Sequence, residues 1–556
     1  MTQTTVYTGK IWTGVADDDW VEAFAVADGR IIATGALHEV EDQVGTPHET
    51  IIIDKGIVTP GLIDGHLHLS LGGTQLAHEL ALDPTDDAET ILAKVREWTS
   101  RLKPGEWVIG GIIGSGVLPM LNNVEFLEKL DEASHGHPVL LRDDTMHNRQ
   151  VNTTALEAMG ITADSPDPEG GTYVRDDQGR LTGALWELAC AVAEGVAAKS
   201  HVDPHQRQVK ALQAALDRLA ALGITTVQDA ATMLPHFEGL AALEESRELD
   251  MRVIASMPIR PFIEDGTVGE ELFAAGMEFE SEHVKPRFAK FVLDGVPTTH
   301  TTALLNPYKC NHSSHDSNFR GELYWTLDDL VAALRRCAEL GLDAKLHATG
   351  DASVRQALDA AEIVRQDTNG GPAMQIAHMS FISEQDLPRF AELNVAADAC
   401  PFMWFPSPLT DGISDFVADE TMANIWPFKD LLATGALISG GSDWPVGLPV
   451  LNPWLGIEGM VTRQAAANDG KARSESGTDY GDRTVNIAQS ITLPQAMAAF
   501  TRESVKALGI ADETGTIEAG NPPTSSPLTA TSSPAKSRTS TTRKCLGVGL
   551  LARIHK

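Results

Sequence analysis

The sequence predicts an α/β protein built on a (β/α)8 barrel, and three observations lead to this fold class. Eight short, apolar, strand-like segments follow one another between residues 61 and 443. Helical segments with apolar residues at spacings of three and four separate most of them. Polar residues gather near the carboxyl ends of several strand-like segments, which is the edge where barrels carry their sites.

Residues 1–58 precede the barrel and read as short strands rather than helices. Apolar and polar residues alternate in them, with glycine and aspartate at the turns. The strand-like stretches are "TTVYTGKIWTG", "EAFAVADGRIIATG" and "TIIIDKGIVTP". We therefore expect this segment to form part of a small β-sandwich.

The barrel itself is predicted over residues 59–510. Eight is the number of parallel strands that a (β/α)8 barrel needs. The strand candidates are "GLIDGHLHL", "TTVQDA", "MRVIASMP", "AKFVLDG", "DAKLHATG", "MQIAHMSF", "NVAADACP" and "GALISGGSD". Helical candidates include "RQVKALQAALDRLAALG", "LDDLVAALRRCAELG" and "SVRQALDAAEIVRQ".

Two connections are too long to be simple loops. Residues from about 75 to 200 separate the first two barrel strands and suffice for an α/β insertion subdomain. Residues 401–426 are rich in aromatic side chains. We expect them to form an irregular loop that lines or covers a pocket.

The overall charge limits the partners that the protein can have. The 556 residues carry a formal net charge of −34, which argues against nucleic acid and anionic membranes as partners. The N-terminus lacks a charged-then-apolar signal pattern, and no apolar stretch approaches membrane-spanning length. Five scattered cysteines without a Cys-x-x-Cys motif fit a reducing compartment. We expect a cytoplasmic protein.

His66 and His68 form a His-x-His pair directly after an apolar run. On a strand, residues two apart point to the same face, so both imidazoles are aimed in one direction. By spacing alone, they are either two surface groups or two ligands of one metal ion.

Four further polar residues stand near the carboxyl ends of predicted barrel strands. Lys290 is in the fourth strand, His347 in the fifth, His378 in the sixth, and Asp443 ends the eighth. Each has a structural interpretation when taken singly, such as a buried histidine or a turn-capping aspartate. Six such residues, including the His-x-His pair, converging on one rim indicate a site instead.

Several stretches in this order resemble one known family. They are "TPGLIDGHLHL", "MHNRQVNTTAL", "PDPEGG", "GRLTGALWELA", "GITTVQDA", "KFVLDG", "LHATGDASVRQALDAAE", "IAHMSFISEQDLPRFAELNV" and "GGSDWPV". The chain is similar to the amidohydrolase superfamily, in its amidohydrolase family 3 branch. That branch includes N-substituted formamide deformylase and hydrolases like the exoenzyme regulatory protein. The resemblance implies a metal-dependent hydrolase with a β-sandwich formed from both chain ends.

The resemblance also implies the ligand set. By position, the metal-site residues would be His66, His68, Lys290, His347, His378 and Asp443. Lys290 would be carboxylated, and its carbamate would bridge two divalent ions. Imidazole and carboxylate ligands suit Zn²⁺, while Mn²⁺, Co²⁺ and Fe²⁺ stay open as alternatives.

The remaining roles follow from the same comparison. Asp443 would move the proton of the attacking water, and His378 or His147 would polarise the substrate carbonyl. His300 and the aromatic residues would face the substrate or form the walls of its pocket. The full set of predicted substrate-binding residues is Asn152, Trp186, Glu187, His300, Trp404 and Trp444.

These observations predict hydrolysis of an amide-like C–N bond in a small organic molecule. An N-substituted formamide, another amide or a carbamate is the expected substrate class. A metal-dependent lyase or decarboxylase on the same barrel is an alternative, and so is a regulatory protein that kept the fold without turnover. We expect a homodimer.

The C-terminal segment, residues 511–556, departs from the family pattern. Its first part is expected to join the sandwich, but no Asp or Glu occurs after Glu518. Prolines and small polar residues in "TSSPLTATSSPAKS" do not suit a sandwich strand. We interpret the tail from about residue 521 as aberrant, the result of a shifted reading frame, and expect no packed strand from about residue 524.

Overall fold

The structure of the protein is a computed structural model. It describes residues 4–83, 86–114, 117–143, 148–168, 171–187, 189–200, 203–261, 266–309, 318–367, 370–446, 451–465 and 480–520. The chain divides into two compact units. The barrel unit comprises Met1–Leu69, Leu216–Asp469 and Gly481–Lys556, and the insertion unit comprises Ser70–Ala215 and Gly470–Tyr480.

Eight parallel strands form the central sheet of the barrel unit, in the order β18-β17-β16-β15-β14-β13-β12-β5. All eight strand candidates from the sequence are therefore present and neighbour one another in chain order. Their bounds are β5 (Leu62–Leu67), β12 (Ile224–Asp229), β13 (Arg252–Pro258), β14 (Val284–Val292), β15 (Asp343–Ala348), β16 (Met374–His378), β17 (Val395–Ala399) and β18 (Ile438–Gly440).

The two edge strands of this sheet, β5 and β18, come together and nearly close the barrel. The amide of Asp443 donates to the carbonyl of His66 at 2.7 Å, and the amide of His68 donates to the carbonyl of Trp444 at 2.8 Å. Gly441 makes this approach possible, because a Cβ there would lie 2.5 Å from the His66 nitrogen. The closure thus sets the His-x-His pair beside Asp443.

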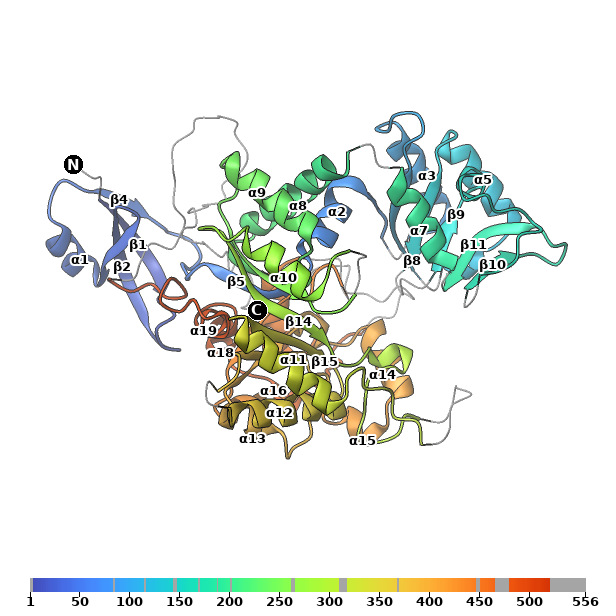
Figure 1. The fold of residues 1–556 in the computed structure, drawn as a ribbon. Helices are drawn as coiled ribbons and strands as arrows, with labels where there is room; N and C mark the ends of the chain where they lie inside the picture. The colour runs from blue at the N-terminus through green and yellow to red at the C-terminus, as the bar shows by residue number, and fades with distance from the viewer. Residues whose placement is uncertain are drawn as a thin grey trace. The chain divides into compact units, whose positions relative to one another are not determined.

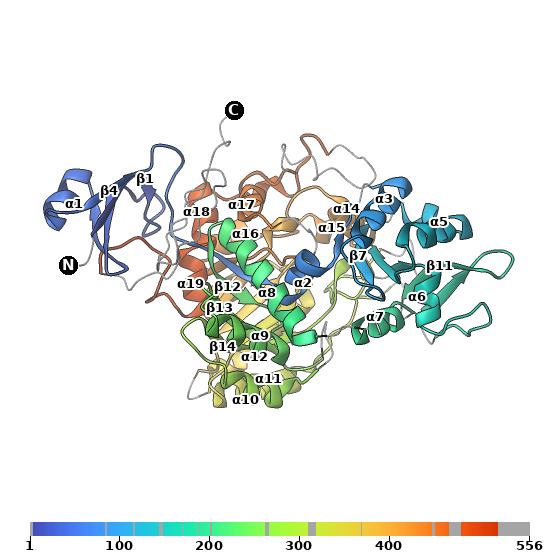
Figure 2. The same cartoon turned by 90° about the horizontal axis from the view of Figure 1, so that it is seen from above.

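Helices cover the outside of the barrel, as in the βα units that the sequence predicts (Figures 1 and 2). The bounds in the first half are α9 (Leu234–Glu245), α10 (Gly269–Met277), η1 (Pro297–Thr299), α11 (Leu327–Glu339) and α12 (Asp351–Arg365). Those in the second half are α13 (Leu387–Glu392), α16 (Phe428–Ala433), α17 (Pro453–Thr462), η3 (Ile487–Gln489), α18 (Leu493–Ala499) and α19 (Arg502–Leu508). Helix α8 (Pro204–Ala221) contains the division between the two units.

The aromatic segment after β17 is not irregular, so the loop prediction for residues 401–426 was wrong. It contains η2 (Pro401–Met403), α14 (Pro408–Phe416) and α15 (Asp419–Met422). Ser407 caps α14 by accepting a hydrogen bond from the amide of Thr410, and Pro408 occupies the first turn. A capping residue followed by proline is a helix start signal.

The N-terminal segment forms one four-stranded sheet in the order β3-β2-β1-β4. Its elements are β1 (Thr5–Trp12), β2 (Trp20–Ala27), β3 (Arg30–Gly35), α1 (Leu37–Val44) and β4 (Glu49–Ile52). The strands match the sequence prediction. Helix α1 was not predicted, and its buried Val40 packs on the sheet. Ile517 packs against the other side of the sheet and donates to the carbonyl of Thr13. The predicted second sandwich layer stays a prediction.

The insertion unit has its own mixed sheet of six strands, in the order β10-β11-β9-β8-β7-β6. The strands are β6 (Leu80–Ala81), β7 (Val108–Ile113), β8 (Val139–Asp143), β9 (Asn148–Val151), β10 (Gly171–Arg175) and β11 (Leu181–Glu187). The helices are α2 (Leu69–His78), α3 (Ala88–Thr99), α4 (Leu118–Leu121), α5 (Val124–Ser134), α6 (Thr153–Ala158) and α7 (Ala189–Lys199). The sequence-based domain boundaries stay a prediction.

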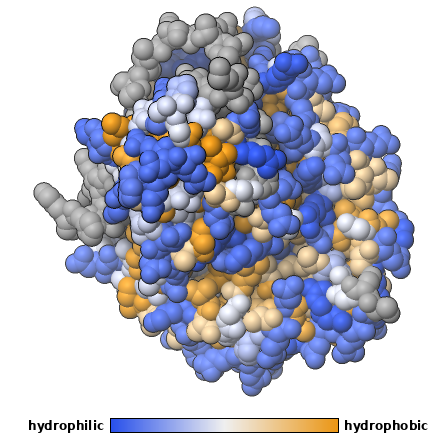
Figure 3. All heavy atoms as spheres, turned by 90° about the vertical axis from the view of Figure 1, so that its left-hand side faces the viewer, coloured by the Kyte–Doolittle hydropathy of each residue, from blue (hydrophilic) through white to orange (hydrophobic). Residues whose placement is uncertain are grey.

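Hydrophilic residues dominate the face of the molecule drawn in Figure 3, with hydrophobic residues in scattered patches between them. Among the described residues, no helix is both long and apolar enough to span a membrane. The predicted aberrant tail, from about residue 521, lies outside the described residues.

Candidate metal centre

His66 is the most enclosed member of the predicted site. Its side chain has no exposed surface at the end of β5, and its Nδ1 lies 2.6 Å from Oδ2 of Asp398 on β17. A carboxylate accepts, so Nδ1 carries the hydrogen and Nε2 keeps its lone pair. Within the described part of the chain, that Nε2 has no hydrogen-bond partner. Burial lowers the pKa of His66 well below its usual value, with contributions from Lys345 and Lys290.

Asp443 lies between three histidines. Its Oδ1 is 3.6 Å from Nε2 of His66 and 3.5 Å from Nε2 of His68, and its Oδ2 is 3.7 Å from Nδ1 of His378. These distances are too long for hydrogen bonds. Two donors bound at about 2.0–2.2 Å to one tetrahedral ion are separated by roughly 3.3–3.6 Å, so the spacing fits shared ligands. The residues present therefore fit a metal ion.

Backbone conformation supports a specialised role for two of these residues. Asp443 has φ of 60° and His378 has φ of 74°, values that L side chains rarely adopt. Such strained positions cluster at functional sites, where the surrounding structure holds them in place.

His347 and His378 lie side by side on β15 and β16, with ring centroids 4.6 Å apart. The Nε2 of His347 donates to the carbonyl of Gly295 at 3.1 Å, so its Nδ1 keeps the free lone pair. Burial lowers the pKa of His347 to about 3, and the nearby Lys290 adds to this effect. Burial also lowers the pKa of His378 well below its usual value. Both histidines are therefore neutral near pH 7, the state in which an imidazole can bind a metal ion.

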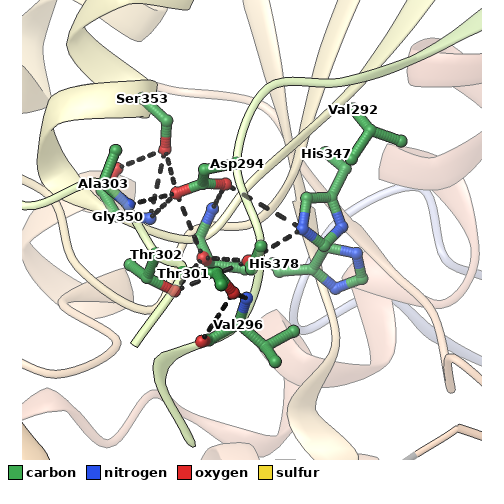
Figure 4. Close-up of polar contacts among 12 residues, drawn as sticks. Val292, Asp294, Val296, Thr301, Thr302, Ala303, His347, Gly350, Ser353 and His378 are labelled. Carbon is green, nitrogen blue, oxygen red and sulfur yellow. Dashed lines mark hydrogen bonds and ion pairs between the residues drawn. The ribbon is translucent and has the colours of Figure 1, made fainter. Parts of the chain in front are cut away.

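Asp294 organises the turn that follows β14 and meets His347 (Figure 4). Its carboxylate accepts from the amides of Ala303, Thr349 and Gly350 at 2.9–3.0 Å. The hydroxyl of Ser353 donates to it at 2.7 Å. This set of donors joins the loop after β14 to the start of α12, and so holds the Gly295 carbonyl that orients His347.

Lys290 lies on β14 and is 2% exposed. Burial lowers its pKa to about 8, and the positive charge of Lys345 lowers it further, against the opposing influence of Asp443 and Asp398. A lysine with so low a pKa has a substantial neutral fraction near physiological pH, and the neutral amine is the form that reacts with electrophiles.

Three buried residues around the candidate ligands were not predicted from the sequence: Lys345, Asp398 and Cys400. Asp398 touches His66, and the Cys400 sulfur lies 3.4 Å from Nδ1 of His378. Strand alternation was the available signal, since Lys345 precedes His347 by two positions and Asp398 precedes Cys400 by two.

Two of the predicted aromatic wall residues, Trp404 and Trp444, are 1% and 3% exposed. Trp404 packs on Trp426 and Phe428, and the Arg463 guanidinium lies over its ring. These contacts bury the ring, and its role as a wall of the substrate pocket stays a prediction. Trp444 adjoins the centre through its carbonyl, which accepts from the His68 amide.

The predicted substrate residue His300 lies in the loop after β14. Its ring contacts those of Tyr308 and Phe416, with centroid distances of 5.1 and 4.2 Å. The structure thus brings His300 into an aromatic cluster of the barrel unit, and its contact with substrate stays a prediction.

The other predicted residues belong to the insertion unit. Asn152 is fully buried and caps α6: its oxygen accepts from the amides of Val139 and Ala155, and its amide nitrogen donates to Ser134 and His137. Trp186, on β11, is 42% exposed. The backbone of Glu187 ends β11, but its side chain lies outside the described part, as does all of His147. Their substrate contacts stay predictions.

A parallel barrel with buried histidines and a carboxylate at the carboxyl end of its strands is the arrangement expected of a metal-dependent barrel hydrolase. The sequence profile of the amidohydrolase family matches residues 54–522. The chain belongs to this family, in its amidohydrolase family 3 branch.

Individual relatives share the family across most of their length. YtcJ of Bacillus subtilis (strain 168) is 26% identical over 519 residues, covering 89% of this chain and 88% of that protein. The N-substituted formamide deformylase of Arthrobacter pascens is 24% identical over 524 residues, covering 93% and 91%. An uncharacterized metal-dependent hydrolase from Pyrococcus horikoshii OT3 has a TM-score of 0.70 at 21% identity, covering 93% and 95%. That last likeness is one of fold.

Proposed function

We propose that this protein hydrolyses an amide-like C–N bond in a small organic molecule. The observation that carries the proposal is Asp443, whose carboxylate lies 3.5–3.7 Å from nitrogens of His66, His68 and His378. N-substituted formamides, other amides and carbamates form the favoured substrate class. The similarity to the N-substituted formamide deformylase of Arthrobacter pascens supports the first of these.

His66, His68, His347, His378 and Asp443 would hold one or two divalent ions, with Zn²⁺ favoured by this donor set. When bound, the ions supply positive charge that acidifies a water molecule and polarises a carbonyl group. Lys290, with its pKa lowered to about 8 by burial, would carry a carbamate as a further metal ligand. The carbamate is part of the proposal.

The protein's own residues would handle the protons. A carboxylate oxygen of Asp443 accepts the proton of the attacking water and later delivers it to the leaving amine nitrogen. His378, whose Nδ1 lies 3.7 Å from the same carboxylate, would donate a hydrogen bond to the substrate carbonyl. Because His347 and His378 are neutral, each keeps a ring-nitrogen lone pair that could bind a metal ion.

The remaining parts of the proposal concern context. We propose a cytoplasmic enzyme, with a small molecule rather than nucleic acid or membrane as its partner, and a homodimeric state. The net charge of −34 supports the exclusion of polyanionic partners.

Metal analysis combined with a substrate panel tests this function. Purified protein should carry close to two divalent ions per chain and cleave at least one formamide, amide or carbamate. Lys290→Ala should lose at least one ion together with activity. Full metal content and turnover in Lys290→Ala would replace the two-ion site by a one-ion site, and a metal-free, inactive wild type would refute the function.

A further inference from the structure

A buried polar cluster lies inside the barrel beside His66, and the proposed proton transfers do not use it. Lys345 on β15 is its centre and has no exposed surface. Its ammonium lies 2.5 Å from Oδ2 of Asp398 and donates to the carbonyl of Gly65 at 2.9 Å. It also donates to the side-chain oxygens of Gln228 at 2.9 Å and Gln375 at 3.1 Å.

This cluster joins five strands at one level of the barrel. Lys345 comes from β15, and its partners come from β5, β12, β16 and β17. Its four acceptors exceed the three hydrogens of an ammonium group, so the buried charge is fully solvated by the protein. Burying a lysine–aspartate pair gives little stability over a well-packed apolar pair, so stability alone does not explain it.

Asp398 connects the cluster to His66. The same oxygen, Oδ2, lies 2.5 Å from the Lys345 ammonium and 2.6 Å from Nδ1 of His66. Lys345 also holds the carbonyl of Gly65, the residue that precedes His66. The imidazole is therefore anchored relative to its own strand, with Nδ1 as donor and Nε2 turned toward Asp443.

We propose that Asp398, held in place by Lys345, is a positioning residue for the metal centre. It fixes the tautomer and orientation of His66 so that the Nε2 lone pair faces the ion. This inference rests on the proposed function, because it takes His66 as a ligand. Carboxylates that orient a ligand histidine typically change metal affinity about 10–100-fold when removed.

The test compares Asp398→Asn with a matched control, Asp386→Asn. Asp386 is also buried, but its carboxylate accepts from the guanidinium groups of Arg355 and Arg389, neither of which is a predicted metal ligand. Zinc affinity is measured by competition with a chromophoric chelator, and the metal-free unfolding midpoint is measured in parallel. We expect zinc to bind about 10–100-fold more weakly to Asp398→Asn, and with wild-type affinity to Asp386→Asn, whatever each does to stability.

Nitrogen-15 NMR of labelled histidines in the metal-free wild type provides an independent readout. His66, assigned with a His66→Gln variant, should carry its hydrogen on Nδ1, and in Lys345→Met this preference should weaken. A hydrogen on Nε2 in the wild type, or unchanged zinc affinity in Asp398→Asn, would overturn the inference.

The same data separate this inference from the proposed function. Wild type that binds no zinc at all would refute both. Tight zinc binding and turnover with an unaffected Asp398→Asn would refute only the positioning role. If Asp398→Asn does not fold, Lys345→Met takes its place: weaker zinc binding than in the wild type supports the inference, and unchanged binding overturns it.

Discussion

At the scale of single residues, the centre depends on which atom each side chain presents. His66 and His347 each donate from one ring nitrogen, to Asp398 and to Gly295, and so leave the other nitrogen free. Asp443 is different, because its oxygens face three histidines without a hydrogen bond to any. A carboxylate in this position can serve as both ligand and proton acceptor.

The first prediction separates those two roles of Asp443. Asp443→Asn keeps the shape of the side chain and one coordinating oxygen but cannot accept the proton, so kcat should fall roughly 10²–10⁴-fold. KM should change far less. Steady-state kinetics on the best substrate measure both, with Asp386→Asn as control. An equal loss in substrate binding and turnover would leave Asp443 with a ligand role alone.

At the scale of elements, the contact between β5 and β18 positions the site. The amide of Asp443 and the carbonyl of His66 bond directly, and Oδ1 of Asp64 accepts from the amides of His66 and Ser442. Burial raises the pKa of Asp64 to about 7, although these hydrogen bonds lower it. Closing the barrel and assembling the centre are therefore one structural event.

A second prediction follows from the space between these strands. In Gly441→Ala, the new methyl group would meet the His66 backbone at 2.5 Å, so β5 and β18 must separate. We expect a loss of about 1–3 kcal/mol of stability and weaker zinc binding. Gly412→Ala, on α14, is the control, because its methyl group has only an ordinary contact at 3.6 Å and an alanine suits a helix. Denaturant unfolding and zinc titration measure both effects. A Gly441→Ala variant with the stability and zinc affinity of the wild type would contradict this account of the closure.

A third prediction concerns the insertion unit, where Glu194 on α7 bonds to Arg142 on β8 and Arg149 on β9 at 2.7–2.9 Å. Burial raises the pKa of Glu194, but the two arginines outweigh it and lower the pKa to about 2 from 4.5. A depressed carboxylate pKa stabilises the folded state above the unfolded value of 4.5. That contribution is lost as the pH falls from 4.5 toward 2.

Glu194→Gln should therefore be less stable than wild type by about 1–3 kcal/mol at pH 7, allowing for solvent screening. The difference should shrink as the pH falls below 4.5. Denaturant unfolding at a series of pH values measures it, with Glu125→Gln on the exposed face of α5 as a control that changes little. A difference independent of pH would show that the ion pairs do not set the pKa of Glu194.

At the scale of the whole molecule, the predicted metal ligands from β5, β14, β15, β16 and the turn after β18 lie close enough to shift one another's pKa values. A metal ion held there ties strands that are distant in sequence. Binding to the folded state alone raises stability by about 4 kcal/mol at a concentration a thousandfold above Kd.

The fourth prediction uses this linkage. Added zinc should raise the thermal midpoint of the metal-free wild type, and His66→Ala should lose most of that rise. His48→Ala serves as control, since His48 is only half-buried, directly before β4, and its ring bonds to the carbonyl of Gly45. Differential scanning fluorimetry with graded zinc measures the shift. An equal rise in His66→Ala would mean that zinc acts elsewhere.

The sequence by itself determined the strands and most of the candidate ligands. Each barrel strand is a short apolar run between turn signals, and alternation placed His66 and His68 on one face. Lys290, His347, His378 and Asp443 were identifiable because a polar residue at a strand's carboxyl end is unusual in an otherwise apolar segment. The helices of residues 401–426 were missed because their aromatic content outweighed the cap at Ser407.

Only the tertiary structure decided which residues contact the candidate ligands. Asp398 is 332 positions from His66, and Lys345 is 280 positions from Gly65, yet each pair is joined by a hydrogen bond. Periodicity reports the face on which a side chain lies, not the residue that meets it across a barrel. The same limit applies to Trp404, whose ring contacts with Trp426, Phe428 and Arg463 are visible only in the folded chain. Which side chains meet inside the barrel depends on strand order and register, and these are set only when the whole chain folds.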